Sequence, residues 1–193
     1  MSDERFSRAV RAFDALNSAD PTLDASGRPR ELAKADWLSG WISRLEPEAS
    51  VALRLAARCQ HLMRWTVKRS EFPDGPAGYH AWRRHMAEFH AQEAEKVLRE
   101  AGYQDDMVTS VRRIVLKQGM KQHADVQCME DALCLSFLEH DLGGFARGQN
   151  EEKLLRILRE TWRKMSPRAH ALAAELLPSL PEELRALVAR ALG

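Results

Sequence analysis

Hydrophobic side chains recur along this chain at intervals of three and four residues, the spacing that places them on one face of an α-helix. In residues 3–17, Phe6, Val10, Phe13 and Leu16 share such a face. No segment alternates between apolar and polar residues over a length that would build a sheet. The pattern therefore predicts an all-α protein, with further helices over 31–45, 48–68, 79–101, 105–118, 124–141, 150–165 and 167–177.

Glycine and proline residues indicate where these helices begin and end. The stretch 70–78 is rich in both residue types and predicts a loop. Gly102 stands where a glycine commonly ends a helix, and Gly143 and Gly144 are expected to close the helix before them. Internal repeats and low-complexity tracts are absent from the sequence.

The length of 193 residues favours a single domain. Apolar residues make up 45% of the chain and charged residues 30%, which is the composition of a globular protein and not of a disordered one. We therefore expect one compact helical bundle over residues 1–193. Its amphipathic C-terminal tail, about 168–192, is expected to pack on the body of the bundle.

The charge balance and the termini narrow the expected partners and location. Lys and Arg number 29 and Asp and Glu 28, so the chain lacks the basic footprint of a protein that binds duplex nucleic acid. No apolar run approaches the ~20 residues that span a membrane, and the first residues lack a secretory signal. Three cysteines without a CxxC pair fit a reducing compartment. We expect a cytoplasmic protein that binds neither duplex nucleic acid nor a membrane.

Two carboxylates stand out in the helix predicted over 124–141. From Met129 to Leu138 the only strongly polar residues are Glu130 and Asp131, so the helix is expected to be buried. A buried carboxylate is unfavourable unless it is paired, hydrogen-bonded or bound to a metal ion. Gln127 lies one helical turn before both carboxylates. The pattern indicates either a metal site or a structural salt bridge to an arginine.

The helix predicted over 48–68 carries a cationic stripe on one face. Its members are spaced by three or four residues, and Arg64 lies beside them: Arg54, Arg58, His61, Trp65 and Lys68. A histidine among such cations suits a metal or acid–base site with phosphate-binding neighbours. The alternative is a solvated basic face on which the histidine has no role.

Three histidines recur every five residues in the helix predicted over 79–101, so they fan around it instead of sharing a face. His80 and His85 lie among charged residues and are expected at the surface. His90 follows Phe89 and precedes Ala91, so it is the candidate for a buried functional histidine.

The order of these polar sites resembles the HD superfamily of metal-dependent phosphohydrolases. His90 follows His61 by 29 residues, and Asp131 follows His90 by 41. The resemblance covers about 55–140 and implies an HD-like, all-helical core that holds one or two divalent ions. Ala91 stands where the His-Asp dyad of that superfamily would need an aspartate. The resemblance therefore implies a remodelled metal site of His61, His90 and Glu130 or Asp131.

Over nearly its full length the chain also resembles an uncharacterised family, domain of unknown function family 4202. The resemblance is carried by several motifs: Asp20-Pro21, Glu31-Leu32, Leu53 to Trp65, Gly78-Tyr79, Trp82-Arg83, Phe89-His90-Ala91, Glu130-Asp131 and Thr161 to Ser166. This second resemblance supplies no reaction.

Two functions follow as hypotheses. In the first, a divalent manganese, iron or zinc ion on the histidines and carboxylates activates water. Arg58, Arg64 and Lys68 hold the phosphate of a nucleotide or another small phosphorylated metabolite. With iron, the same scaffold would also suit oxygen chemistry. In the second hypothesis no metal binds, Glu130 and Asp131 pair with Arg58 or Arg64, and the bundle binds an anionic ligand or partner without turning it over.

Overall fold

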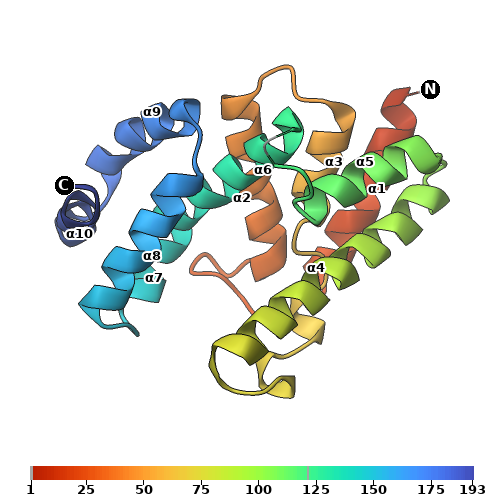
Figure 1. Ribbon diagram of the computed structural model, residues 1–193. Coiled ribbons are helices and arrows are strands. Elements are labelled where there is room, and N and C mark those ends of the chain that lie inside the picture. The colour runs from red at the N-terminus through yellow and green to blue at the C-terminus, as the bar shows by residue number, and fades with distance from the viewer. Residues whose placement is uncertain (1, 121) are drawn as a thin grey trace.

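The computed structural model describes residues 2–120 and 122–193, and helices dominate it throughout (Figure 1). Within this described part no strand forms, and the one β-type contact is an isolated bridge between Leu23 and Pro29. The prediction of an all-α, single-domain protein is confirmed. The candidate site is therefore positioned by helices and the turns between them.

The helices begin and end close to the predicted positions, apart from two differences described below. The predicted loop over 70–78 is shorter than expected, because residues 75–78 already belong to the helix that was expected to begin at 79. The first part of the chain forms α1 Ser2–Ser18, α2 Arg30–Leu45, α3 Val51–Cys59, α4 Gly75–Glu100 and α5 Asp105–Val115. The second part forms α6 Ala124–Ser136, α7 Leu142–Ala146, α8 Glu151–Lys164, α9 Pro167–Leu176 and α10 Glu182–Leu192. Short 3₁₀ turns lie at Arg64–Thr66, Arg69–Glu71 and Leu177–Ser179.

Helix α6 runs through the middle of the molecule. It packs against α2, α5 and α3 on one side and against α8 and α9 on the other (Figure 1). Val126, Met129, Ala132 and Leu135 are fully buried, which confirms the interpretation of this segment as a buried helix. Its two carboxylates are therefore placed in the interior.

The C-terminal helices form a lobe on the far side of α6 from the N-terminus (Figure 1). Helix α9 packs against α6, and α10 packs against α8. Leu187, Val188 and Ala191 of α10 are buried by this packing. The amphipathic tail thus lies on the body of the same chain.

The predicted helix over 48–68 is wrong beyond Cys59, where α3 ends. The buried Asn17 side chain donates to Arg58 O (3.2 Å) and accepts from Met63 N (3.4 Å), which stabilises a turn in place of further helix. Met63 in this turn has a φ of 53°, a left-handed conformation that ends a helix. The predicted cationic stripe is therefore broken, and its members lie on separate elements.

The second difference concerns Gly143 and Gly144, which lie inside α7 instead of closing the helix before it. Helix α6 passes into α7 through a π-helical segment at Phe137–Asp141. Such a segment adds a residue to the turn and shifts the following residues around the helix axis. Gly102, by contrast, ends α4 as predicted, with a φ of 91°.

None of the helices within the described residues is long and apolar enough to cross a membrane.

Candidate functional site

His61 and His90 lie against each other, as the metal-site hypothesis requires. Their ring centroids are 6.1 Å apart, and the ring planes meet at 69°. His61 lies in the turn that follows α3, whereas His90 lies in α4. The left-handed residue Met63 follows His61 and ends the helical turn, and the Leu62 carbonyl in this turn bonds to the His90 ring at 2.7 Å.

His90 is held in one tautomer by the backbone. Its Nδ1 lies 2.7 Å from Leu62 O, and since a carbonyl oxygen only accepts, Nδ1 carries the proton. Nε2 is then a bare acceptor, and it is buried without a hydrogen-bond partner. Burial lowers the pKa of His90 to about 4, so the ring is neutral at physiological pH. A histidine whose second nitrogen is fixed in this way has the form of a metal ligand.

Glu31, in the first turn of α2, is the third member of the site. Its Oε2 lies 4.0 Å from His61 Nδ1, and neither atom has a hydrogen-bond partner. The carboxylate is 7% exposed, and Oε1 lies 3.8 Å from Lys34 Nζ. Burial raises the pKa of Glu31, and the charges of Lys34 and Arg64 only partly oppose this effect.

The surroundings of His61 are cationic. Burial lowers the pKa of this ring well below its usual value, and the nearby charges of Arg64, Lys34 and Lys117 lower it further. Arg64 stacks its guanidinium over the Trp82 ring at 4.6 Å. The His61 side chain is still 25% exposed, so the site is open to solvent on one side.

Glu130 is buried and bound by two lysines. Lys117 Nζ lies 2.5 Å from Oε2, and Lys164 Nζ lies 3.7 Å from Oε1. Burial acts to raise the pKa of Glu130, but Lys117, Lys164 and Arg83 outweigh it and hold the pKa below its usual value. The expected pairing of this carboxylate with Arg58 or Arg64 is thus replaced by pairing with lysines.

Asp131 serves the start of α9. Its Oδ1 accepts from Ser166 N (2.8 Å) and Gln127 Nε2 (2.9 Å), and its Oδ2 accepts from Ser166 Oγ (2.5 Å). Ser166 in turn caps α9 through Ala169 N. Because both carboxylate oxygens are used here, the structure ties Asp131 to the C-terminal lobe and not to the histidine pair.

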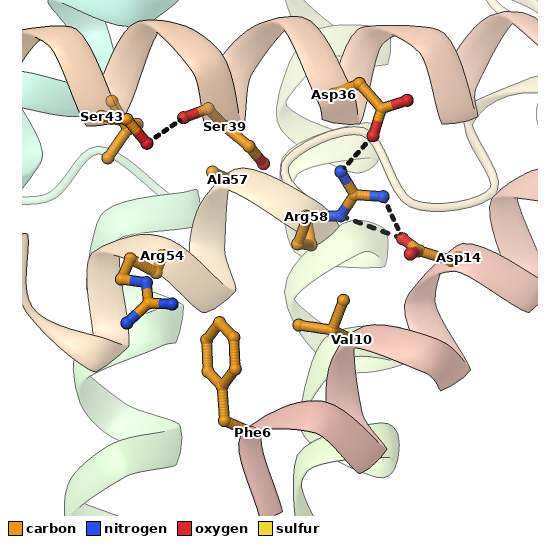
Figure 2. A pocket seen from close by; sticks show the side chains of 10 residues that line it. Phe6, Val10, Asp14, Asp36, Ser39, Ser43, Arg54, Ala57 and Arg58 are labelled. Carbon is orange, nitrogen blue, oxygen red and sulfur yellow. Dashed lines mark hydrogen bonds and ion pairs between the residues drawn. The ribbon is translucent and has the colours of Figure 1, made fainter. Parts of the chain in front are cut away.

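Arg58 belongs to a different cluster. Its guanidinium lies between Asp14 on α1 and Asp36 on α2 and forms ion pairs with both (Figure 2). This ion-pair network borders a pocket between α1, α2 and α3, where Arg54 lies over the Phe6 ring at 4.4 Å. The Arg58 side chain is only 11% exposed, and the two aspartates neutralise its charge. The ion pairs link α3 to α1 and α2.

Of the three predicted phosphate-binding cations, Arg64 is the one that lies beside His61 and Glu31. Lys68 precedes the second 3₁₀ turn and is exposed. Lys34 and Lys117 are near His61 instead, and the sequence reasoning did not identify either of them. Lys117 follows the end of α5. A basic residue is common there because it interacts favourably with the helix dipole, so its presence does not by itself indicate a functional site.

Glu31 was also missed, because an acidic residue in a first turn normally serves the helix dipole. The Glu31 backbone N–H is, however, bound by Asp20 Oδ2 at 3.0 Å, so its side chain is free for another use. The preceding Asp20-Pro21 turn was a signal that another carboxylate caps this helix.

The three donor atoms suit a manganese, iron or zinc ion in their chemistry, being two neutral imidazole nitrogens and a carboxylate oxygen. In the described ranges 2–120 and 122–193, no three His, Cys, Asp or Glu side chains have converged on one point. The donors are instead arranged as two neighbouring pairs, Glu31 with His61 and His61 with His90. A bound ion would have to draw these pairs together.

Nucleophilic cysteine chemistry is disfavoured. Burial raises the pKa of each of the three thiols, Cys59, Cys128 and Cys134, to about 12, so they stay protonated at neutral pH.

A family model described as "Domain of unknown function (DUF4202)" matches residues 7–188. No curated protein and no solved structure matches the chain.

Proposed function

The chain belongs to this DUF4202 family, which is defined without a reaction, and we propose from the site itself that it is a metal-dependent phosphohydrolase. Its substrate is a nucleotide or another small phosphorylated metabolite, and its site is a remodelled relative of the HD type. The proposal includes a cytoplasmic location, in keeping with the free thiols of Cys59, Cys128 and Cys134.

One observation carries the proposal. Glu31 Oε2, His61 Nδ1 and His90 Nε2 are buried, neighbouring and without hydrogen-bond partners. A buried polar atom without a partner costs about 1–3 kcal/mol. Three such neighbouring atoms are expected where a bound ligand supplies the missing partner of each. Two imidazole nitrogens and a carboxylate oxygen suit a divalent manganese, iron or zinc ion.

The residues would divide the work as follows. His61, His90 and Glu31 would hold the divalent ion, which supplies a water of lowered pKa as nucleophile. Leu62 O fixes the His90 ring so that its Nε2 lone pair stays available. Arg64 and Lys34 would bind phosphate oxygens, and their charges offset the negative charge that develops during hydrolysis.

A phosphorylated ligand is favoured by the excess of positive charge. Lys34, Arg64 and Lys117 all lie close enough to lower the pKa of His61, whereas Glu31 is the nearest carboxylate to that ring. A phosphate group neutralises such a cluster, and it also offsets the repulsion between these cations and a metal ion.

The second candidate is an anion-binding protein without metal or reaction. It is favoured by Glu130, both of whose oxygens face lysine ammonium groups, and by the lack of a converged ligand set among the residues described. In this case the cations would bind a phosphorylated ligand without turning it over.

The deciding experiment is elemental analysis of protein purified without a metal-affinity tag. We expect close to one equivalent of manganese, iron or zinc in the wild type and its loss in His61→Ala and Glu31→Gln. His85→Ala is the matched control, because His85 is an exposed histidine of the same helix as His90.

Metal lost from the site variants and kept by His85→Ala would justify a hydrolysis screen with phosphorylated metabolites. Wild-type protein that takes up no ion after incubation with each metal would overturn the phosphohydrolase mechanism and favour the second candidate.

A further inference from the structure

Lys117 occupies a backbone position that normally belongs to glycine. It follows Leu116, the C-terminal cap of α5; its N–H bonds to Ile114 O and the Gln118 N–H bonds to Arg113 O. This pair of bonds is the Schellman arrangement, whose first residue beyond the helix adopts a left-handed conformation. Lys117 has a φ of 57°, which is unfavourable for a side chain with a Cβ atom.

The Lys117 side chain forms an ion pair that glycine at this position would lack. Its ammonium lies 2.5 Å from Glu130 Oε2, and the Glu130 carboxylate is 8% exposed. Lys164 approaches the other carboxylate oxygen at 3.7 Å. The strained turn thus directs a positive charge into the interior, onto a carboxylate that was expected to bind metal.

Both oxygens of Glu130 are therefore committed to ammonium groups. A divalent ion on this carboxylate would lie within a few ångströms of two positive charges, and such charges repel strongly in a partly buried site. Lys117 is itself 29% exposed, so its ammonium is still accessible to a ligand that enters from solvent.

We propose that Lys117 takes the place of a second metal ion: Glu130 anchors its ammonium, which binds an oxygen of a phosphate group. The site accordingly takes at most one divalent ion, on the side of His61, His90 and Glu31. This inference rests on the proposed function for the metal ion, whereas the phosphate contact stands without it.

Three variants separate these roles. Lys117→Gly removes the ammonium and relieves the backbone, since glycine favours a positive φ. Lys117→Arg keeps a cation, and Glu130→Gln removes the anchoring charge while keeping the shape of the side chain. Circular dichroism establishes first that each variant is folded.

The experiment is calorimetric titration with Mn²⁺ and, separately, with inorganic phosphate. We expect one Mn²⁺ equivalent in the wild type and in Glu130→Gln. Phosphate should bind about tenfold more weakly, or worse, to Lys117→Gly, because a charge-assisted contact is lost. Lys117→Arg should recover part of this affinity.

Two Mn²⁺ equivalents in the wild type, or loss of Mn²⁺ from Glu130→Gln, would overturn the proposal. So would phosphate affinity that is absent in the wild type or unchanged in Lys117→Gly. If no variant and no wild-type sample binds Mn²⁺, the phosphohydrolase fails, while weaker phosphate binding by Lys117→Gly still supports the role of Lys117.

Discussion

At the scale of single residues, the site consists of polar atoms that the fold buries without satisfying. His90 donates to Leu62 O and leaves Nε2 bare, and Glu31 and His61 each leave one atom without a partner. Elsewhere in the described structure buried charges are matched, as Arg58 is by Asp14 and Asp36. The contrast supports the proposal that this cluster binds a ligand, whereas Arg58 belongs to a structural ion-pair network.

The buried His90 leads to a prediction about pH. Its folded pKa of about 4 lies below the 6.5 of an exposed histidine, so the unfolded chain takes up the proton first. The neutral His90 ring therefore contributes its full share of stability well above pH 6.5. This contribution is lost as the pH falls from 6.5 toward 4. Between pH 7.5 and 5 the contribution of His90 to unfolding free energy should fall by roughly 2 kcal/mol.

Urea denaturation at both pH values measures this effect. His90→Gln should show a smaller loss of stability between pH 7.5 and 5 than the wild type, by about that amount, whereas the exposed His85→Gln should behave as the wild type. Comparison with a variant is needed because the raised pKa of Glu31 acts in the opposite direction. Equal losses in wild type and His90→Gln would contradict the assignment.

At the scale of elements, the ends of helices place the functional groups. His61 lies beside His90 in the turn that follows α3, and the turn after α5 directs Lys117 toward Glu130. Met63 and Lys117 are the non-glycine residues with positive φ within the described backbone, and both flank this site. Backbone strain of this kind is common where side chains must be held for function.

Gly102 tests the same principle where no site is involved. Its φ is 91°, and Tyr103 N bonds to Leu98 O to close α4. Gly102→Ala should lower the free energy of unfolding by about 1 kcal/mol or more, because alanine resists a positive φ. Urea denaturation measures the change, and Mn²⁺ content should stay as in the wild type. A variant as stable as the wild type would contradict the need for glycine at this helix end.

At the scale of the whole molecule, α6 joins the histidine-bearing body to the C-terminal lobe. Its Glu130 faces Lys117 after α5 and Lys164 at the end of α8, while the neighbouring Asp131 holds Ser166 at the start of α9. Two adjacent carboxylates on one buried helix therefore have different roles. Glu130 holds two lysines, whereas Asp131 belongs to the junction between the two parts.

Asp131→Asn should accordingly act on stability and not on metal. It weakens the bonds to Ser166 N and Oγ, and the loss of hydrogen bonds to a charged group costs about 2 kcal/mol. Urea denaturation should show the loss, while hydrogen exchange should show faster opening of α9. Metal content should be unchanged in the folded variant. Normal stability with metal lost would return Asp131 to the ligand set.

The local pattern of the sequence was sufficient to predict most of the fold. Three- and four-residue periodicity predicted the helices, and the near-absence of polar residues in 129–138 predicted the burial of α6. Both depend on interactions within one helix or on the average cost of exposing apolar surface. The helix over 48–68 was overextended because Asn17, on another element, determines where α3 ends.

The candidate site was less predictable, because its geometry depends on contacts between residues far apart in the chain. The pattern by itself identified His90, Glu130 and Asp131 as polar groups in apolar surroundings and His61 as a member of a cationic stripe. Tertiary structure alone placed Glu31 beside His61, gave Glu130 to Lys117 and Lys164, and assigned Asp131 to Ser166. Burial of a charge can be inferred from local hydrophobicity, whereas its partner is decided by the packing that brings distant segments together.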